Sequence, residues 1–212
     1  PRTWGLTAPL LAFLGRESLT TTAKQVAEEV RAALGPEVHT PLQSTRDGTA
    51  HAVSVARSSV EGADLVFVFV GDSPLLSADS ICSLAETHLK TRAGCTFLTS
   101  SFDKHFPYAR VVRDGSGRVT ACVEERDCTA EQALITEYLT SHFVFDGPTL
   151  WPLLDRVEPH PITGERYLTD VIDLMLSEGH RVEAVSIEDW RELVGLNTPE
   201  DVAWAEAVLA DG

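Results

Sequence analysis

The chain has 212 residues, of which 43% are hydrophobic, and carries a formal net charge of −15 at pH 7. Such an acidic chain argues against nucleic-acid binding, which needs a basic patch, and no apolar run approaches the roughly 20 residues of a membrane span. The four cysteines form no C-x-x-C pair, so we expect buried free thiols and a cytoplasmic protein. Residues 1–5 lack the pattern of a signal peptide, and we expect none.

The first half of the chain predicts a parallel sheet built from alternating strands and helices. Apolar residues recur every three or four positions in the predicted helices and run continuously in the predicted strands. This alternation is typical of βαβ units. In chain order we expect a candidate strand at residues 10–14, a helix at 18–34, a short strand at 38–42, a helix at 50–60, a strand at 65–70, a helix at 77–92 and a strand at 95–100.

The second half begins with a hairpin signal, because the turn residues 114–117 separate two β-rich runs at 110–113 and 118–123. Beyond it we expect a helical turn at 129–133, a strand at 138–145, helices at 149–156 and 168–178, a strand at 182–187 and a helix at 199–210 capped by Thr198. We therefore predict one α/β domain over residues 1–212. It should have a Rossmann-like, mostly parallel mixed sheet flanked by helices, with an inserted hairpin region.

The strand at residues 65–70 and the acid that follows it form the most informative stretch. Its six apolar residues do not alternate, which is typical of a strand covered on both faces in the middle of a parallel sheet. Gly71 ends the run, and Asp72 follows at the carboxyl edge, where open α/β sheets bind ligands. A carboxylate there can hold Mg²⁺ against phosphate oxygens. Asp72 can equally cap the next helix or hold a turn, and this stretch alone leaves both interpretations open.

Five separated segments resemble, in the same order, motifs of the sugar-1-phosphate nucleotidyltransferases. Within that family they are most similar to uridylyltransferase domains that act on N-acetylglucosamine 1-phosphate. No single segment is specific, and the resemblance rests on their shared order. Residues 42–52 resemble the family's L-Q-x-x-x-x-G-T-x-H-A loop, 71–75 its G-D-x-P-L turn, 117–127 its G-x-V-x-x-I-V-E-x-x-D segment, 165–170 its E-Y-Y-L-T-D helix start and 195–197 its G-V-N close.

The resemblance implies a fold of the nucleotide-diphospho-sugar transferase type and a nucleotidyl transfer. An NTP, with UTP as first candidate, would react with a sugar 1-phosphate, with N-acetylglucosamine 1-phosphate as first candidate, and release pyrophosphate. Mg²⁺ would be the cofactor, and a homo-oligomer is compatible with the resemblance. Asp72 and Asn197 would be the catalytic and metal-binding residues, Gln43, Gly48, Thr49, Gly71 and Asp72 would bind the nucleotide, and Ala109, Glu124 and Thr140 would bind the sugar.

The chain also departs from the family's pattern. The family's glycine-rich L-A-A-G-x-G-T-R-M loop, which cradles the triphosphate, has no counterpart in this sequence. We therefore expect the domain to lack its first βα unit. Ala109 replaces the glycine of the family's Y-G-R, and Leu139 replaces an asparagine of its E-x-N-T-G. These differences keep open an alternative, a non-catalytic relative with a binding, regulatory or structural role. His51, next to the base loop, is interpreted as a packing and hydrogen-bonding residue.

Overall fold

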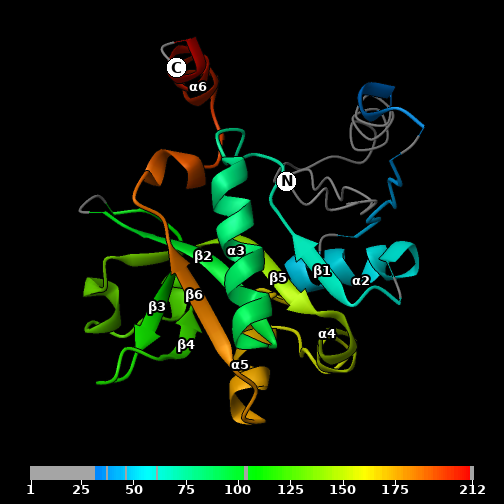
Figure 1. Cartoon of the computed structure of the whole chain (residues 1–212), viewed down its shortest axis with the longest axis vertical. Coiled ribbons are helices and arrows are strands. Elements are labelled where there is room, and N and C mark those ends of the chain that lie inside the picture. The colour runs from blue at the N-terminus through cyan, green and yellow to red at the C-terminus, as the bar shows by residue number, and fades with distance from the viewer. Residues whose placement is uncertain (1–31, 37, 46, 61, 103–104, 211–212) are drawn as a thin grey trace.

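The computed structural model describes residues 32–36, 38–45, 47–60, 62–102 and 105–210. Within them, six strands form one open mixed sheet with helices on both faces, so the predicted α/β class is confirmed (Figure 1). The candidate strand at 10–14 and most of the helix at 18–34 lie outside the described residues. In the described part of the chain, no helix has both the length and the apolar character needed to cross a membrane.

Strand β5 is the central strand of the sheet and pairs with three others. Along one edge it pairs with β2, and its other edge is shared by β1 and β3. Strand β2 continues the sheet to β6, and β3 continues it to β4. The strands span Leu65–Val68 (β1), Cys95–Ser101 (β2), Ala109–Arg113 (β3), Val119–Val123 (β4), Glu137–Asp146 (β5) and Val182–Ser186 (β6).

Strand direction agrees with the predicted parallel arrangement only in part. Strands β1, β2, β3 and β6 run in one direction, as βαβ units require. The antiparallel β5 is inserted among them, however, so β2 and β6 are the only parallel neighbours among the described strands. The sheet is therefore mixed in its pairing, and its ladders are mostly antiparallel.

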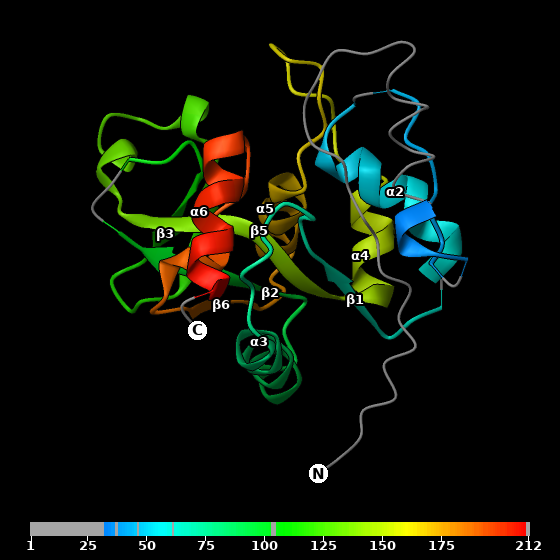
Figure 2. The same cartoon turned by 90° about the horizontal axis from the view of Figure 1, so that it is seen from above.

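The helices form one layer on each face of this sheet (Figure 2). Helix α3 (Ala78–Thr91) covers one face, where Leu84 packs with Leu98 and Val144. Helices α2 (Thr49–Val60), α4 (Gly147–Leu154) and α5 (Thr169–Ser177) cover the other face over a larger apolar cluster. Helix α6 (Pro199–Ala210) extends away from these layers, and short 3₁₀ segments occupy Glu125–Asp127, Gln132–Leu134 and Trp190–Leu193.

Strand β1 is apolar throughout because both of its faces are packed. Val66 and Val68 join the larger cluster, whereas Leu65 and Phe67 pack against the cluster under α3. The prediction of a strand covered on both faces is thus confirmed. Its expected place in the middle of a parallel sheet is wrong for the described residues, since β1 pairs there only with the antiparallel β5 and ends at Val68.

Two further expectations need correction. Residues 38–42 form no strand, and half of the Leu42 surface is exposed, so this segment has neither a partner strand nor a core to cover. Of the four thiols expected to be buried, Cys95 and Cys122 are buried, Cys128 is only partly buried and Cys82 is exposed. Cys82 is exposed because it lies on α3 opposite the buried positions Ser80, Leu84 and His88. Strand β5 also carries a bulge that no sequence pattern predicted, since the register shifts between β2 and β5 and Ser141 has a φ of 65°.

Candidate functional site

The turn after β1 is bound to a loop from the far end of the chain. The backbone N–H of Leu196 donates to the carbonyl oxygen of Asp72 over 2.8 Å. Gly195 lies so close to Asp72 that a Cβ added there would sit 3.0 Å from the carboxylate Oδ2. The Nδ2 of Asn197 donates to the Gly195 carbonyl over 3.0 Å, and its Oδ1 makes no hydrogen bond to the described residues. The structure thus brings the loop that carries Asn197 to Asp72, while Gly71 is exposed beside it.

Tyr108, just before β3, completes this contact. Its phenol oxygen accepts a hydrogen bond from the Gly195 N–H over 3.3 Å. Burial, together with the nearby carboxylates of Asp72 and Asp201, raises the pKa of Tyr108, although the Gly195 hydrogen bond opposes this shift. The phenol is therefore protonated at neutral pH. It lies close to Asp72 and holds the loop at residues 195–197 by its backbone.

The oxygen atoms of this cluster are of the chemical type that Mg²⁺ prefers in proteins. Burial raises the pKa of Asp72 above its usual value, and a backbone hydrogen bond partly opposes the shift. The hydroxyl of Ser73 is buried without a hydrogen-bond partner among the described residues. No group of three or more His, Cys, Asp or Glu side chains in the described ranges could hold a metal. Mg²⁺ needs only one or two protein oxygen ligands when phosphate and water supply the others.

A second cluster forms around the polar loop before α2. Gly48 has a φ of 93°, and an added Cβ would lie 2.2 Å from the carbonyl oxygen of Arg166. That carbonyl accepts the Ala50 N–H over 3.0 Å. The Gln43 side-chain amide donates to the Gly48 carbonyl over 3.1 Å and lies 3.0 Å from Nδ1 of His51. The hydrogen-bonding interpretation of His51 is therefore confirmed, and the Gln43 side chain is fixed in place.

Hydrogen bonds connect this loop to the predicted sugar-binding carboxylate. The Leu168 N–H donates to Oγ1 of Thr49 over 2.9 Å, and the hydroxyl of the next residue, Thr169, donates to Oε1 of Glu124 over 2.9 Å. Burial raises the pKa of Glu124, and the Thr169 hydrogen bond partly opposes the shift. The segment at residues 165–170 thus joins Gln43, Gly48, Thr49 and Glu124 in one bonded network.

The other predicted sugar residues lie in the sheet. Ala109 is 4% exposed and pairs across the strands with Leu139, which is 2% exposed. Both belong to the larger apolar cluster, so the extra Cβ of Ala109 and the side chain of Leu139 are accommodated in the core. Thr140 is buried next to the bulge, with its Oγ1 3.4 Å from Nδ1 of His142. No hydrogen bond connects Ala109 or Thr140 to Glu124 or Asp72.

Sequence reasoning missed Tyr108, Arg166 and Thr169 as site residues. Arg166 and Thr169 contribute through a backbone carbonyl and a hydroxyl, and both lie inside a segment already singled out by its motif. Tyr108 precedes the altered position Ala109, and its partner Gly195 is 87 residues away. No local sequence pattern predicts that contact.

Curated relatives match most of this chain. Bifunctional protein GlmU of Corynebacterium efficiens is 40% identical over 183 residues, which are 86% of this chain and 38% of that protein. GlmU of Heliobacterium modesticaldum is 40% identical over 185 residues, 87% of this chain and 40% of the relative. GlmU of Streptomyces coelicolor is 38% identical over 204 residues, 93% of this chain and 42% of the relative.

The chain spans about two fifths of the length of these relatives. No protein-family model matches it. The resemblance predicted from its motifs is nevertheless confirmed by identities of 34–40% to several GlmU proteins. Over most of its length, the chain is a homologue of part of the bifunctional GlmU proteins.

Proposed function

We propose that this chain takes part in nucleotidyl transfer from an NTP, most readily UTP, to a sugar 1-phosphate, with release of pyrophosphate. The observation that carries the proposal is the contact between the Asp72 turn and the loop at residues 195–197. It brings Asp72, just beyond the C-terminal end of β1, to the loop that carries the Asn197 amide from the far end of the chain. A carboxylate and an amide oxygen suit Mg²⁺, which neutralises phosphate charge when it is bound.

The second cluster suits the organic parts of the two substrates. The fixed loop that contains Gln43, Gly48 and Thr49 would contact the base, since amide and backbone groups there offer donors and acceptors. Glu124, held by Thr169, would accept hydrogen bonds from sugar hydroxyls. The hydrogen-bonded segment at 165–170 would fix the distance between base and sugar. Positioning of this kind is the main contribution a protein makes to phosphoryl-type transfer.

The choice of sugar phosphate rests on the relatives and on fewer residues of this chain than the choice of reaction does. The GlmU homologues favour N-acetylglucosamine 1-phosphate as acceptor. Leu139 and Ala109 form an apolar pair in the core, so neither side chain can supply a hydrogen bond to a sugar. We therefore propose that sugar selectivity is looser than the choice of reaction.

The test is an assay of the full-length protein for pyrophosphate release. UTP and the other NTPs are each paired with N-acetylglucosamine 1-phosphate and glucose 1-phosphate, with and without Mg²⁺. We expect Mg²⁺-dependent turnover, fastest with UTP and differing little between the two sugars. Absence of turnover with every pair would contradict the proposal.

The buried Ala109–Leu139 pair favours a second candidate, a relative that binds a nucleotide without transferring it. Calorimetry distinguishes the two. Binding of UTP without turnover under the same conditions would support the second candidate, whereas turnover would exclude it.

A further inference from the structure

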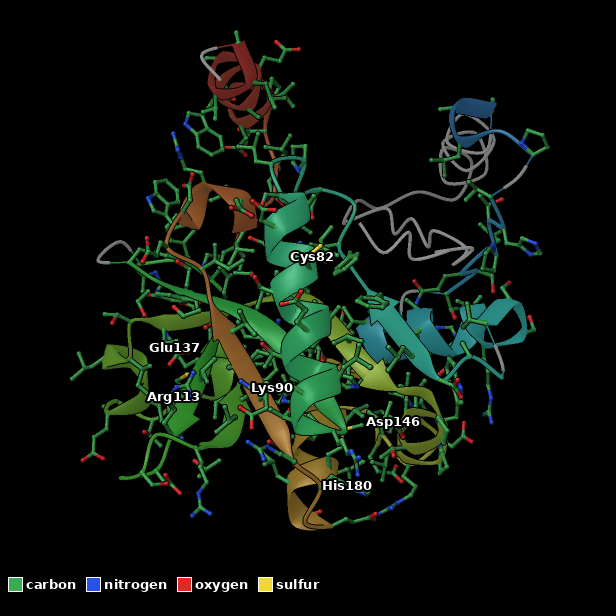
Figure 3. The ribbon with its side chains drawn as sticks, in the orientation of Figure 1. Cys82, Lys90, Arg113, Glu137, Asp146 and His180 are labelled. Carbon is green, nitrogen blue, oxygen red and sulfur yellow. The ribbon has the colours of Figure 1, made fainter. Side chains whose placement is uncertain are left out.

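A cavity of about 420 Å³ lies at the opposite end of the sheet from Asp72. Its walls come from the C-terminal end of α3, from the junction of β5 and α4, and from the residues just before β6. In Figure 3, Asp146 and His180 lie near the Lys90 end of α3, away from Cys82. The volume is in the range of small-molecule sites. We propose that this cavity binds a small phosphate-bearing anion.

Two arginines supply the charge that such a ligand requires. Arg92 caps α3 with a φ of 53°, and its backbone N–H donates to the carbonyl oxygen of His88. The residue is exposed, and its side chain makes no hydrogen bond or ion pair with the described residues. Arg181 uses its Nε for Glu183 and keeps its terminal nitrogens free of other described partners. They line the cavity from separate segments. Guanidinium groups bind phosphate oxygens in pairs through parallel N–H bonds, so two of them suit a phosphate with two negative charges.

Two histidines add hydrogen-bonding groups. His88 is buried, and its Nδ1 lies 3.0 Å from the hydroxyl of Thr96, which fixes the ring and leaves Nε2 for a ligand. Burial lowers the pKa of His88, although Asp146 opposes the shift, so the ring is mostly neutral at pH 7 and binds by hydrogen bonding. His180 is partly exposed beside the cavity.

The acidic groups around the cavity already have partners. Asp146, which lines it, accepts from the Thr149 N–H over 2.9 Å and from the Thr149 hydroxyl as the cap of α4. A carboxylate in this position is compensated by the positive end of the helix. Glu178 pairs with Arg156 and lies 3.8 Å from His180, and Glu183 pairs with Arg181. The arginines therefore retain donors for an added anion although the chain as a whole is acidic.

The cavity is separate from the candidate nucleotide site. Helix α3 runs from its cap Ser77, near the Asp72 turn, to Arg92 at the cavity. At 1.5 Å per residue, its 14 residues span about 20 Å. A small phosphate-bearing anion cannot bridge that distance, so this inference does not rest on the proposed function.

The test is an NMR titration of the ¹⁵N-labelled chain with inorganic phosphate. We expect saturable shifts at the amides of Gly94, Thr149 and His180. The double variant Arg92→Asn and Arg181→Gln should bind phosphate at least about tenfold more weakly, because two charge-assisted contacts are lost. Asparagine is chosen because it tolerates a positive φ. Arg118→Gln, an exposed arginine paired with Asp114 on the hairpin, is the matched control and should bind as wild type.

Thermal unfolding monitors the fold of each variant, and the single variant Arg92→Asn replaces the double variant if the latter fails to fold. Equal phosphate affinity in the wild type and the folded variant would overturn the proposal. So would shifts confined to the amides around Gly71, which would place the phosphate at the other end of the sheet.

Discussion

The backbone N–H of Leu196 donates to the carbonyl oxygen of Asp72 over 2.8 Å and joins two segments more than half of the chain apart. Gly195 beside it lies against the Asp72 carboxylate without a side chain to displace it. This contact is made by backbone atoms, so it holds the loop in place while it leaves the Asp72 carboxylate and the Oδ1 of Asn197 available. The predictions below test whether these available groups act together.

Tyr108→Phe should weaken binding of Mg²⁺ without unfolding the protein. The substitution removes the phenol oxygen that accepts the Gly195 N–H. Among the described residues, the loop at residues 195–197 is then held beside Asp72 only by the bond from Leu196 to the Asp72 carbonyl. Removing a group that orients metal ligands by hydrogen bonds typically lowers metal affinity by about tenfold or more. The measurement is the Mg²⁺ concentration for half-maximal pyrophosphate release. Tyr167→Phe, which removes a phenol bound to Thr163 and Glu165, is the control, and an equal effect there would refute the role of Tyr108.

Gly48→Ala should destabilise the polar loop before α2, and by more than the strain of a positive φ alone would cause. The new Cβ would lie 2.2 Å from the Arg166 carbonyl, at a φ of 93°. Gly117→Ala is the matched control, because Gly117 has a φ of 85° but nothing within 4 Å. We expect the control to lose about 1 kcal/mol of unfolding free energy, from the αL penalty alone. Gly48→Ala should lose clearly more in urea unfolding and raise the KM for UTP. Equal losses would show that the close approach to Arg166 is unimportant.

Glu124→Gln should raise the KM for the sugar phosphate and leave the KM for UTP unchanged. Glutamine keeps an acceptor for the Thr169 hydroxyl but loses the charge that strengthens hydrogen bonds from a sugar. Losing a charge-assisted bond typically costs about 1.5–3 kcal/mol, roughly a tenfold to hundredfold rise in KM. Glu125→Gln, at a partly exposed neighbour paired with His105, should change neither KM. A rise in the KM for UTP alone would contradict the assignment of Glu124.

His142 should make the fold sensitive to acid. Its ring is buried, its Nε2 has no partner in the described residues, and burial lowers its pKa to about 4. A histidine with a lowered pKa stabilises the fold fully above its ordinary pKa of 6.5, and this contribution is lost as the pH falls toward 4. At about pH 5 the loss should be about 2 kcal/mol relative to pH 8.

Urea unfolding of wild type and His142→Leu at both pH values measures this effect. The variant should lose about 2 kcal/mol less on acidification than the wild type does. Asp173, whose pKa burial raises to about 6, acts in the opposite direction, but it is present in both proteins and cancels in the comparison. Identical pH dependence of the two proteins would show that His142 is not the acid-sensitive group.

Local sequence signals predicted the elements far better than their pairing. Helix α3 follows from its cap, because the Ser77 hydroxyl does accept the Ser80 N–H, and the hairpin follows from its turn residues. The central position of β5 could not be predicted in the same way. Residues 138–145 have the pattern of a strand, but nothing in that pattern indicates which strands lie beside it. Pairing depends on contacts distant in the chain. The strand expected at 38–42 is absent for the same reason, because a segment becomes a strand only beside a partner strand.

The candidate site was predictable where it follows motifs. Asp72 and Gly48 lie in motif segments, and the structure gives each a physical reason, a contact with the loop at 195–197 and a close approach to Arg166. The bulge at Ser141 and the contact between Tyr108 and Gly195 were not predictable. Both depend on how separate strands and loops meet in space, which one sequence does not encode locally.

The most direct test of the account is Mg²⁺-dependent UTP binding by wild type and Asp72→Asn, measured by calorimetry. Asparagine preserves the shape of a half-buried side chain and removes the charge that a metal ligand requires. The account predicts that the wild type binds UTP more tightly with Mg²⁺, and that Asp72→Asn loses this gain while Asp79→Asn, at an exposed acid on α3, keeps it. The same Mg²⁺ enhancement in Asp72→Asn as in the wild type would contradict the account.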